Sequence, residues 1–211
     1  MNAAILLAAG ASTRMGRPKQ LLDWAGQPLL AAQVEALLSA GCAPVIVVVG
    51  AHERLVRAAL PDHPSVRCVA NHAWREGRAG SVRMGARAVP PSVDGVVVAS
   101  VDSPCSVVAI RACSEALAER SDAWIVVPRC DGRNGHPPLF HSDLLADLQT
   151  VTERGEGIRA LRRRHAERTI FVETDDPLCL LNLNTPQSYQ RALALSTLPD
   201  SDASPPAGAN C

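Results

Sequence analysis

Residues 7–19 are the stretch whose residue types and spacing point most directly to chemistry. Their sequence, LAAGASTRMGRPK, combines small residues with the cations Arg14 and Lys19. Small residues let backbone N–H groups approach phosphates, and the cations would neutralise the phosphate charge. Lys19 is the single lysine among 21 basic residues, which suggests a place for a compact, flexible ammonium. The alternative is an ordinary strand-to-helix loop with surface arginines.

The loop does not match two common nucleotide-binding motifs. No Gly-Lys-Ser/Thr follows Gly16, which excludes a Walker A loop. The G-x-G-x-x-G of nicotinamide dinucleotide sites is also missing.

A carboxylate stands where a metal ion could join such a loop. Asp102 directly follows the apolar run Gly95–Val101. Carboxylate oxygens suit Mg²⁺, which also binds the phosphates of substrates. The plainer interpretation is that Asp102 caps the next helix.

Two amides form a third candidate segment. If residues 181–184 are extended, Asn182 and Asn184 share one face of the strand, and their oxygens could complete a metal shell. Asn184 or Thr185 before Pro186 is equally typical of a helix N-cap, so both roles stay open for Asn184.

The apolar runs predict the fold that positions these segments. Fully apolar strands that alternate with helices are typical of a parallel sheet covered on both faces. We therefore predict an α/β fold, a three-layer α/β/α sandwich with a Rossmann-like, mostly parallel sheet. The predicted strands are Ala3–Ala9, Val45–Val49, Val66–Ala70, Gly95–Val101 and Ala123–Val127, and the predicted helices are Pro28–Ala40, Glu53–Leu60, Ser81–Ala88 and Val107–Glu119.

The pattern changes after Pro128. Asp131-Gly132 signals a hairpin turn, and Gly135–Phe140, with its two prolines, predicts an edge strand. The remaining predictions are helices at Ser142–Leu148, Ile158–Ala166 and Pro186–Leu195, the last packed on the sheet, and strands at Thr169–Val172 and Leu178–Leu183. We expect one domain over residues 1–198 and a disordered tail over 199–211.

Composition narrows the class of protein. The 211 residues are 47% hydrophobic and 20% charged, with 21 acidic and 21 basic side chains, so a globular domain without a long-range field is expected. This argues against nucleic-acid and membrane partners. The apolar runs are too short to span a bilayer, and no signal peptide is recognised. Seven cysteines without a C-x-x-C pair favour the reducing cytoplasm over a disulfide framework or a zinc site.

Taken together, the motifs resemble those of the molybdenum cofactor cytidylyltransferases, within the MobA-like NTP transferase family. The pattern L-x-x-G-x-S-x-R-M-G-x-x-K is met over residues 7–19 and continues into PKQLL and GQPLL. Asn71–Gly77 with Gly80-Ser81 resembles the segment that contacts the nucleoside, and Asp102-Ser103-Pro104 resembles a metal-binding Asp-x-Pro. Gly135-His136-Pro137 resembles the pterin-side segment of the cytidylyl branch. The likeness spans roughly Ala3 to Tyr189.

The resemblance implies transfer of a nucleotide to a phosphate of molybdopterin, with Mg²⁺ as cofactor. The N-terminal part, to about residue 128, would bind the nucleotide, and residues 129–198 the acceptor. The implied site residues are Arg14, Lys19 and Asp102 for catalysis; Leu7, Ala8, Ala9, Gly10, Met15, Gly16, Asn71, Gly80 and Ser81 for the nucleotide; Asp102, Asn184 and Asn182 for the metal; and His136 for the acceptor.

The nucleotide is the least determined part of this interpretation. Ala9 resembles the cytidylyl branch, since a Cβ there would crowd a purine, whereas the amides of Asn182 and Asn184 resemble the guanylyl branch. CTP is expected, with GTP as the alternative. A sugar-phosphate acceptor, and a non-catalytic carrier that delivers the cofactor to a molybdenum hydroxylase, stay open. Arg162-Arg163-Arg164 fits a solvated helix face, with attraction of the pterin phosphate as the less favoured interpretation.

Overall fold

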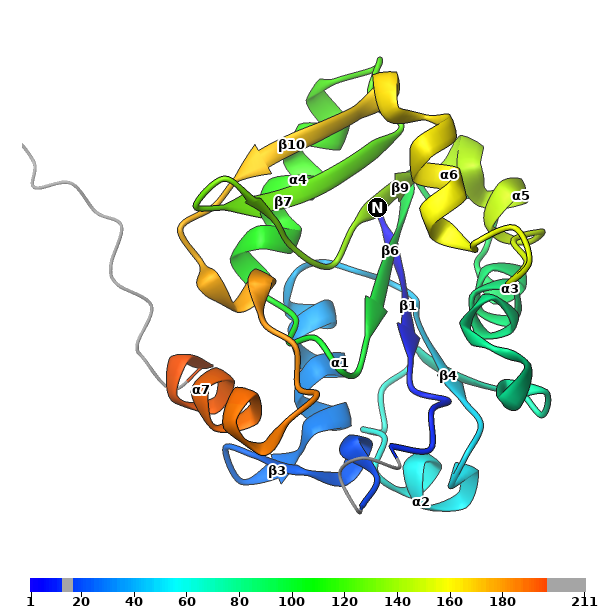
Figure 1. Ribbon diagram of the computed structural model, residues 1–211. Coiled ribbons are helices and arrows are strands. Elements are labelled where there is room, and N and C mark those ends of the chain that lie inside the picture. Colours follow the sequence, from blue (N-terminus) through cyan, green and yellow to red (C-terminus); the bar gives the residue numbers. More distant parts are fainter. Residues whose placement is uncertain (13–16, 197–211) are drawn as a thin grey trace, which may run out of the picture.

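The computed structural model describes residues 1–12 and 17–196 (Figure 1). Three predicted site residues, Arg14, Met15 and Gly16, lie outside the described residues. The predicted tail, 199–211, lies outside them too.

A mostly parallel sheet forms the middle of the molecule. Its strand order is β10-β7-β9-β6-β1-β4-β5, with β8 paired to β7. β9 runs antiparallel to β6 and β7, and β8 antiparallel to β7, while the other pairs are parallel. The strands are β1 (Ala3–Leu7), β4 (Val45–Val49), β5 (Val66–Ala70), β6 (Gly95–Ser100), β7 (Ile125–Cys130), β8 (Arg133–Asn134), β9 (Leu139–His141) and β10 (Thr169–Glu173). A separate ribbon pairs β2 (Asp23–Trp24) with β3 (Gln27–Pro28).

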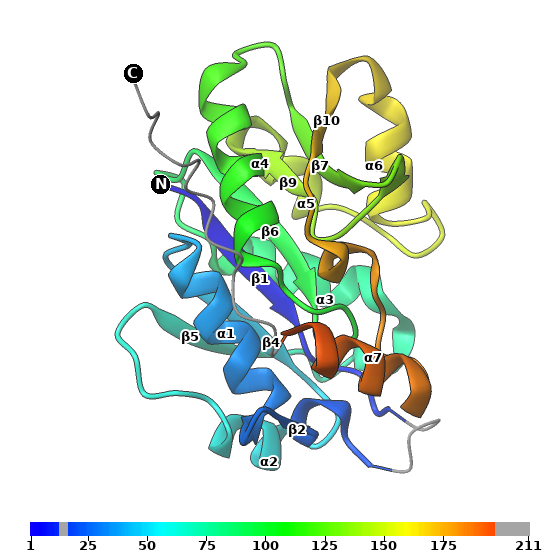
Figure 2. The same ribbon diagram turned by 90° about the vertical axis from the view of Figure 1, so that its left-hand side faces the viewer.

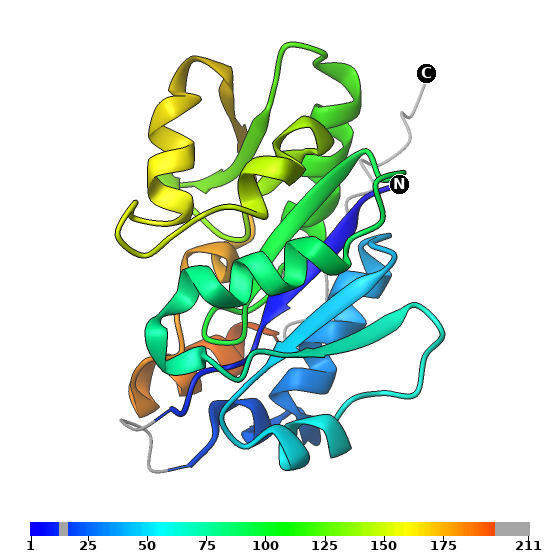
Figure 3. The same cartoon turned by 90° about the vertical axis from the view of Figure 1, so that its right-hand side faces the viewer.

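Helices cover both faces of the sheet, which confirms the predicted three-layer sandwich (Figures 2 and 3). Alternate residues of β1 point to opposite faces, as strand geometry requires: Ala4 and Leu6 pack in one apolar cluster, and Ile5 in the other. The first cluster is covered by α1 (Leu29–Ser39), α4 (Val107–Glu119) and α7 (Pro186–Ser196), and the second by α3 (Arg78–Ala88), α5 (Leu145–Leu148) and α6 (Ile158–Arg164). The short α2 (Glu53–Ala58) follows β4.

Close contact between α3 and the sheet depends on a glycine. A Cβ on Gly85 would collide with Ile5 Cγ2 and lie 3.1 Å from Val48 Cγ2. The missing side chain therefore lets α3 approach β1 and β4 closely.

Four of the five 3₁₀ helices in the described residues are three residues long. They are η2 (Lys19–Leu21), η3 (Trp74–Glu76), η4 (Ser142–Leu144) and η5 (Ala166–Arg168). The first two hold residues of the candidate site.

The final helix packs as predicted. Tyr189 and Ala192 of α7 are buried in the first cluster, and the Tyr189 ring meets Trp24 edge-on at 6.0 Å. This contact joins α7 to the β2–β3 ribbon, which follows the predicted phosphate-binding loop of residues 7–19.

The prediction of an edge strand over Gly135–Phe140 is wrong. β9 lies inside the sheet, between β6 and β7, because both prolines precede it. Pro138 contributes its carbonyl alone, which accepts from Val98 N at 3.0 Å. The prolines therefore do not interrupt the ladder.

The prediction of a strand over Leu178–Leu183 is also wrong. A 3₁₀ helix, η6, occupies Pro177–Leu180, and Asp176 caps it by accepting from Leu178 N at 2.9 Å. Capping and a proline in the first turn favour a helical start over an extended chain. The argument that Asn182 and Asn184 share a strand face fails with it.

No helix of residues 1–12 and 17–196 has the length and apolarity to cross a bilayer. The six cysteines in this part of the chain are free thiols, and burial raises the pKa of Cys42 and Cys113 to about 12.

Candidate active site

A cleft of about 560 Å³ opens beyond the carboxyl ends of β1 and β6, whose arrowheads share one end of the sheet in Figure 1. Ligands of open parallel sheets bind at this edge. The cleft is lined by Leu7, Ala9, Gly10, Ala11, Ser12, Lys19, Gln20, Trp74, Arg75, Gly77, Arg78, Ser81, Ser100, Val101, Asp102 and Asn184. It thus joins the loop after β1, the start of α3, the end of β6 and the segment before α7.

Lys19 is held in this cleft from two sides. Its side chain is buried, at 7% exposure. Its backbone N–H donates to Ser12 Oγ at 3.0 Å, and its Nζ donates to Asn184 Oδ1 at 2.7 Å. Because an amide carries no net charge, this bond orients the ammonium without adding negative charge to the cleft.

Gln20 fixes the shape of the loop after β1, a role that sequence reasoning missed. The side chain is fully buried, and its Nε2 donates to the carbonyls of Ala8 at 2.6 Å and Gly10 at 2.9 Å. These bonds occupy the loop carbonyls. The one indication in the sequence was a polar residue inside the PKQLL motif, but its two carbonyl partners could not be named without the structure.

Asp102 lines the cleft directly after β6. The helix-cap interpretation is wrong, because Ser106 caps α4, its Oγ accepting from Ala109 N at 3.0 Å. The Asp102 backbone carbonyl accepts from Leu183 N at 2.6 Å, which joins β6 to the segment before α7. Among residues 1–12 and 17–196, no side chain pairs with the Asp102 carboxylate, so it can accept a cation.

The two predicted amide ligands are separated. Asn184 lines the cleft, while Asn182 is exposed and lies outside its lining. The N-cap of α7 is Thr185, whose Oγ1 accepts from Ser188 N at 3.1 Å. Asn184 is therefore available to bind Lys19, and the pairing of Asn182 with Asn184 at a metal is not supported. Within the described ranges, no group of three or more His, Cys, Asp or Glu side chains could hold a metal.

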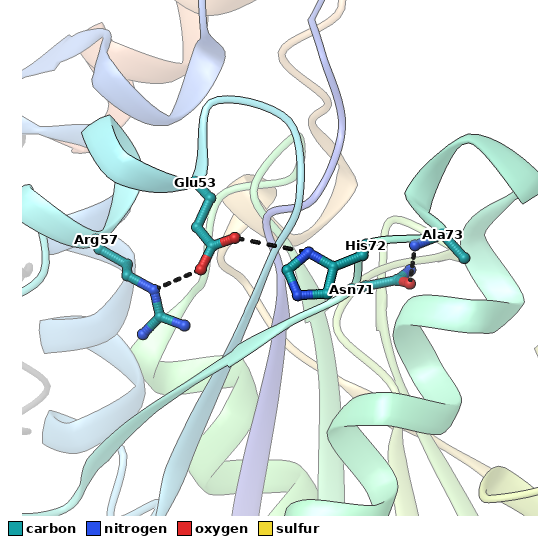
Figure 4. Close-up of polar contacts among 5 residues, drawn as sticks. All are labelled: Glu53, Arg57, Asn71, His72 and Ala73. Carbon is teal, nitrogen blue, oxygen red and sulfur yellow. Dashed lines mark hydrogen bonds and ion pairs between the residues drawn. The ribbon is translucent and has the colours of Figure 1, made fainter.

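Three single residues of the nucleoside segment, Asn71, Gly80 and Ser81, were predicted to bind the nucleotide, and one of them lines the cleft. Asn71 is buried, its Oδ1 accepting from Ala73 N at 3.1 Å (Figure 4) and its Nδ2 donating to Ser81 Oγ at 2.9 Å. Ser81 lines the cleft, whereas Asn71 and Gly80 line a neighbouring cavity of about 470 Å³. Asn71 thus positions Ser81.

Of the other residues predicted to bind the nucleotide, some line the cleft and one does not. Leu7, Ala9 and Gly10 line the cleft. Ala8 is buried in the core and offers its carbonyl to Gln20 instead.

An ion-paired surface group flanks the nucleoside segment. Glu53 accepts from Arg57 Nε at 2.9 Å, and His72 Nδ1 lies 3.9 Å from its second oxygen (Figure 4). The His72 side chain is exposed.

One wall of the cleft comes from Trp74, Arg75 and Gly77, which belong to the Asn71–Gly77 segment that resembles a nucleoside-contacting one. The Arg75 guanidinium stacks on the Trp74 ring, 4.4 Å from its centroid. Gly77 follows with φ +119°, and a Cβ there would collide with the Glu153 side chain. Glu153 accepts from Ala79 N at the start of α3. A residue with a side chain at position 77 would therefore displace this wall and Arg78 beside it.

His136 lies beside the cleft, in a narrow recess. Arg78, Ser100, Ser103 and Pro137 line the recess with it, and Arg78 and Ser100 also line the cleft. The imidazole reaches solvent, yet partial desolvation, followed by the charges of Arg78 and Arg162, lowers its pKa. The lowered pKa favours the neutral imidazole, which offers a hydrogen bond without a charge.

Comparison with known proteins agrees with this geometry. The MobA-like NTP transferase domain matches residues 4–169. The chain belongs to this family. It is similar to a nucleotidyl transferase from Methanothermobacter thermautotroptrophicus (27% identity, 92% of this chain and 96% of that chain, TM-score 0.75). It is also similar to Rv0371C of Mycobacterium tuberculosis H37Rv in complex with manganese (25% identity, 92% and 98%, TM-score 0.68).

One relative is named as an oxidoreductase and not as a transferase. Nicotine blue oxidoreductase from Paenarthrobacter nicotinovorans is 28% identical over 201 residues, which cover 90% of this chain and 95% of that protein. The family and the solved nucleotidyl transferase identify the chain as a nucleotidyltransferase of α/β fold.

Proposed function

We propose that this nucleotidyltransferase is a CTP:molybdopterin cytidylyltransferase, which forms the dinucleotide cofactor and releases pyrophosphate. The observation that carries the proposal is the placing of Lys19 and Asp102 in one cleft at the carboxyl ends of β1 and β6. A cation for the triphosphate and a carboxylate for its metal ion are the two elements that phosphoryl transfer needs most.

The triphosphate would lie along the loop after β1. Gln20 holds the Ala8 and Gly10 carbonyls and so fixes the backbone of this loop, whose N–H groups beyond Ala8 would meet phosphate oxygens. The Lys19 ammonium, oriented by Asn184, would neutralise charge that develops on the leaving pyrophosphate. Arg14 would add a second cation.

The residues fit Mg²⁺ in one respect and not in another. Asp102 offers an unpaired carboxylate at the cleft, and Mg²⁺ often takes one or two carboxylates together with substrate phosphates and water. A site made wholly of protein ligands is not supported, because Asn182 is outside the cleft and Asn184 is bound to Lys19. Bound there, Mg²⁺ would screen the charge of the triphosphate.

The chemical step would need no nucleophilic side chain. An oxygen of the molybdopterin phosphate forms a bond to the α-phosphorus of CTP, and the bond from that phosphorus to the bridging oxygen breaks. Pyrophosphate leaves with the electron pair, so atoms and charge balance without an oxidant. The protein contributes alignment and charge neutralisation.

Base selection would depend on the small wall beside β4. Ala9 lines the cleft, and its Cβ would lie 2.9 Å from a Cβ on Gly50, so the Ala9 methyl group already fills the space next to that glycine. The choice of a pyrimidine over a purine rests on the resemblance of Ala9 to the cytidylyl branch. GTP as nucleotide, or a sugar phosphate as acceptor, would use the same loop and the same Lys19. A carrier that hands the cofactor to a molybdenum hydroxylase is the non-catalytic alternative.

Substitution of Lys19 tests the proposal. Lys19→Ala should lower turnover by about two to three orders of magnitude, the effect of losing a transition-state donor. Arg17→Ala, which removes an exposed cation two residues away, is the matched control. Pyrophosphate release with CTP, Mg²⁺ and molybdopterin is the assay, and thermal unfolding checks the fold of each variant. Near-normal turnover in Lys19→Ala would refute the assignment.

A further inference from the structure

A glutamine of α1 is buried where this helix faces the core. Gln33 is 3% exposed. It lies on the face of the helix that also holds the buried residues Leu29, Leu30, Val34 and Leu37. An apolar side chain would fill this place with no polar group to satisfy, whereas a buried amide is costly unless it is hydrogen-bonded. Both partners of the Gln33 amide lie outside α1, in the segment that follows β6.

The two ends of the Gln33 amide bind the loop that carries Asp102. Nε2 donates to the carbonyl oxygen of Val101, the residue before Asp102, at 3.1 Å. Oε1 accepts from the Cys105 thiol, which follows Asp102 in the same loop, at 3.5 Å. One side chain therefore holds the loop on both sides of the carboxylate, and Figure 1 shows this loop passing beside α1.

Backbone hydrogen bonds hold the same loop from other directions. Val101 N donates to the Leu7 carbonyl at 3.1 Å, at the end of β1, and the Asp102 carbonyl accepts from Leu183 N at 2.6 Å. These bonds join the loop to the sheet and to the segment before α7, and Gln33 joins it to α1. The backbone of Asp102 is thus fixed on several sides, and Gln33 supplies the contact from the core.

Asp102 depends on this support because no second acid is at hand. Among the described residues that line the cleft, Asp102 is the one carboxylate, beside the cations Lys19, Arg75 and Arg78. A metal ion held by one carboxylate, substrate phosphates and water depends on where that carboxylate points. If the loop moved, no other acid in this lining could take its place.

We propose that Gln33 is a positioning residue for the metal ion, because it fixes the loop that presents Asp102 to the cleft. Gln33 is not part of the cleft lining, so it acts through the backbone of Val101 and not by contact with substrate. The inference rests on the proposed function and extends it to α1, behind the cleft. Replacement of residues that support a metal ligand typically lowers metal affinity or activity about 10- to 100-fold.

Gln33→Met is the decisive variant, since it removes both hydrogen bonds and keeps a side chain of similar length. The matched control is Gln27→Met, the same change at a surface residue bonded to Glu35. Titration with Mn²⁺ alone, followed by electron paramagnetic resonance, should give a Kd at least about 10-fold above the wild-type value in Gln33→Met. The Kd of Gln27→Met should stay within about 2-fold. Equal binding by Gln33→Met and the wild-type protein, or binding by neither, would overturn the inference.

Two further readouts separate positioning of the metal from a merely structural role. Hydrogen exchange of the Ser103 and Leu183 amides, which bond within and to the loop, should be about 10-fold faster in Gln33→Met, with β4 unchanged. In the pyrophosphate assay, the Mg²⁺ concentration that gives half-maximal rate should rise, while the KM for CTP at saturating Mg²⁺ stays within about 2-fold. Faster exchange with an unchanged Mg²⁺ dependence would show a structural role alone and contradict the inference.

Cys105→Ala serves as the test if thermal unfolding shows that Gln33→Met does not fold. It removes one of the two bonds of the Gln33 amide and should raise the Kd for Mn²⁺ by a smaller factor, about 2- to 5-fold. An unchanged Kd in this variant would then overturn the inference. If the wild-type protein releases no pyrophosphate with any nucleotide, the proposed function fails. Mn²⁺ binding and hydrogen exchange then decide the role of Gln33 by the same criteria.

Discussion

Gln20→Leu separates the shape of the phosphate loop from its charge. The substitution keeps a side chain of similar size but removes the Nε2 donor that binds the Ala8 and Gly10 carbonyls at 2.6 and 2.9 Å. Lys19 and Asp102 keep their charges. The substitution also removes the Oε1 acceptor of Ser12 Oγ at 3.5 Å. A loss of function would then come from the shape of the loop, Ser12 included, and not from a lost charge.

The expected loss of unfolding free energy follows from the burial of the two carbonyls that lose their hydrogen bonds. The Ala8 carbonyl belongs to a fully buried residue, and an unsatisfied buried acceptor costs about 1–3 kcal/mol. Gly10 is exposed, so water can replace the lost bond, and about 0.5–1.5 kcal/mol is expected there. The sum is about 2–4 kcal/mol of unfolding free energy. For a chain of this length, that corresponds to a fall in Tm of about 5–15 °C.

Thermal and urea unfolding measure the loss of unfolding free energy, and the KM for CTP measures how well the altered loop binds the nucleotide. We expect the KM to rise, because the loop N–H groups are no longer held in one arrangement. The control is Gln27→Leu, which removes a surface bond to Glu35 and should change the free energy of unfolding by less than about 0.5 kcal/mol. Gln20→Leu with the stability and KM of the wild-type protein would refute this account of the loop.

Two further substitutions test the site and the core. Asn184→Ala should lower kcat about 10- to 100-fold, because Lys19 loses its orienting bond. The kcat of the control, Asn182→Ala, should stay within about 2-fold of the wild-type value. Equal effects of the two substitutions in the steady-state assay would contradict the separation of the amides. Gly85→Ala should cost about 1–3 kcal/mol by urea unfolding, since the new methyl group meets Ile5. Alanine favours helices more than glycine, so an increase in stability would show that this contact relaxes freely.

The middle of the sheet was predictable because its strands β1, β4 and β6 are buried on both faces. Val45–Val49 and Val66–Ala70 are apolar or nearly so over five residues, and their bounds agree with the prediction. The errors fall after Pro128, where the rules for parallel strands no longer apply. The prolines of the Gly135 segment precede β9 instead of interrupting it, and η6 depends on a cap by Asp176 that competes with strand formation.

Part of the site was predictable from motif spacing. Lys19, Asp102 and Ser81 line the cleft as expected. What the sequence could not supply is the partner of each polar group. Gln20 reads as a surface residue until its two backbone carbonyls are known.

The two capping questions needed coordinates for the same reason. Ser106 and Thr185 cap the helices and leave Asp102 and Asn184 for the cleft. Arg162, Arg163 and Arg164 could not be distinguished from one another, because only tertiary contacts show that Arg163 pairs with Glu156 and Arg164 with Asp147.

Pyrophosphate release is the most direct test of the central claim. The wild-type protein would be mixed with Mg²⁺, molybdopterin and CTP, GTP, ATP or UTP in turn. We predict that turnover is higher with CTP than with the other three nucleotides, and that chelation of the metal ion abolishes it. Turnover with GTP above CTP would reverse the choice of nucleotide that rests on Ala9. Binding of molybdopterin without pyrophosphate from any of the four would contradict nucleotidyl transfer and leave the carrier function.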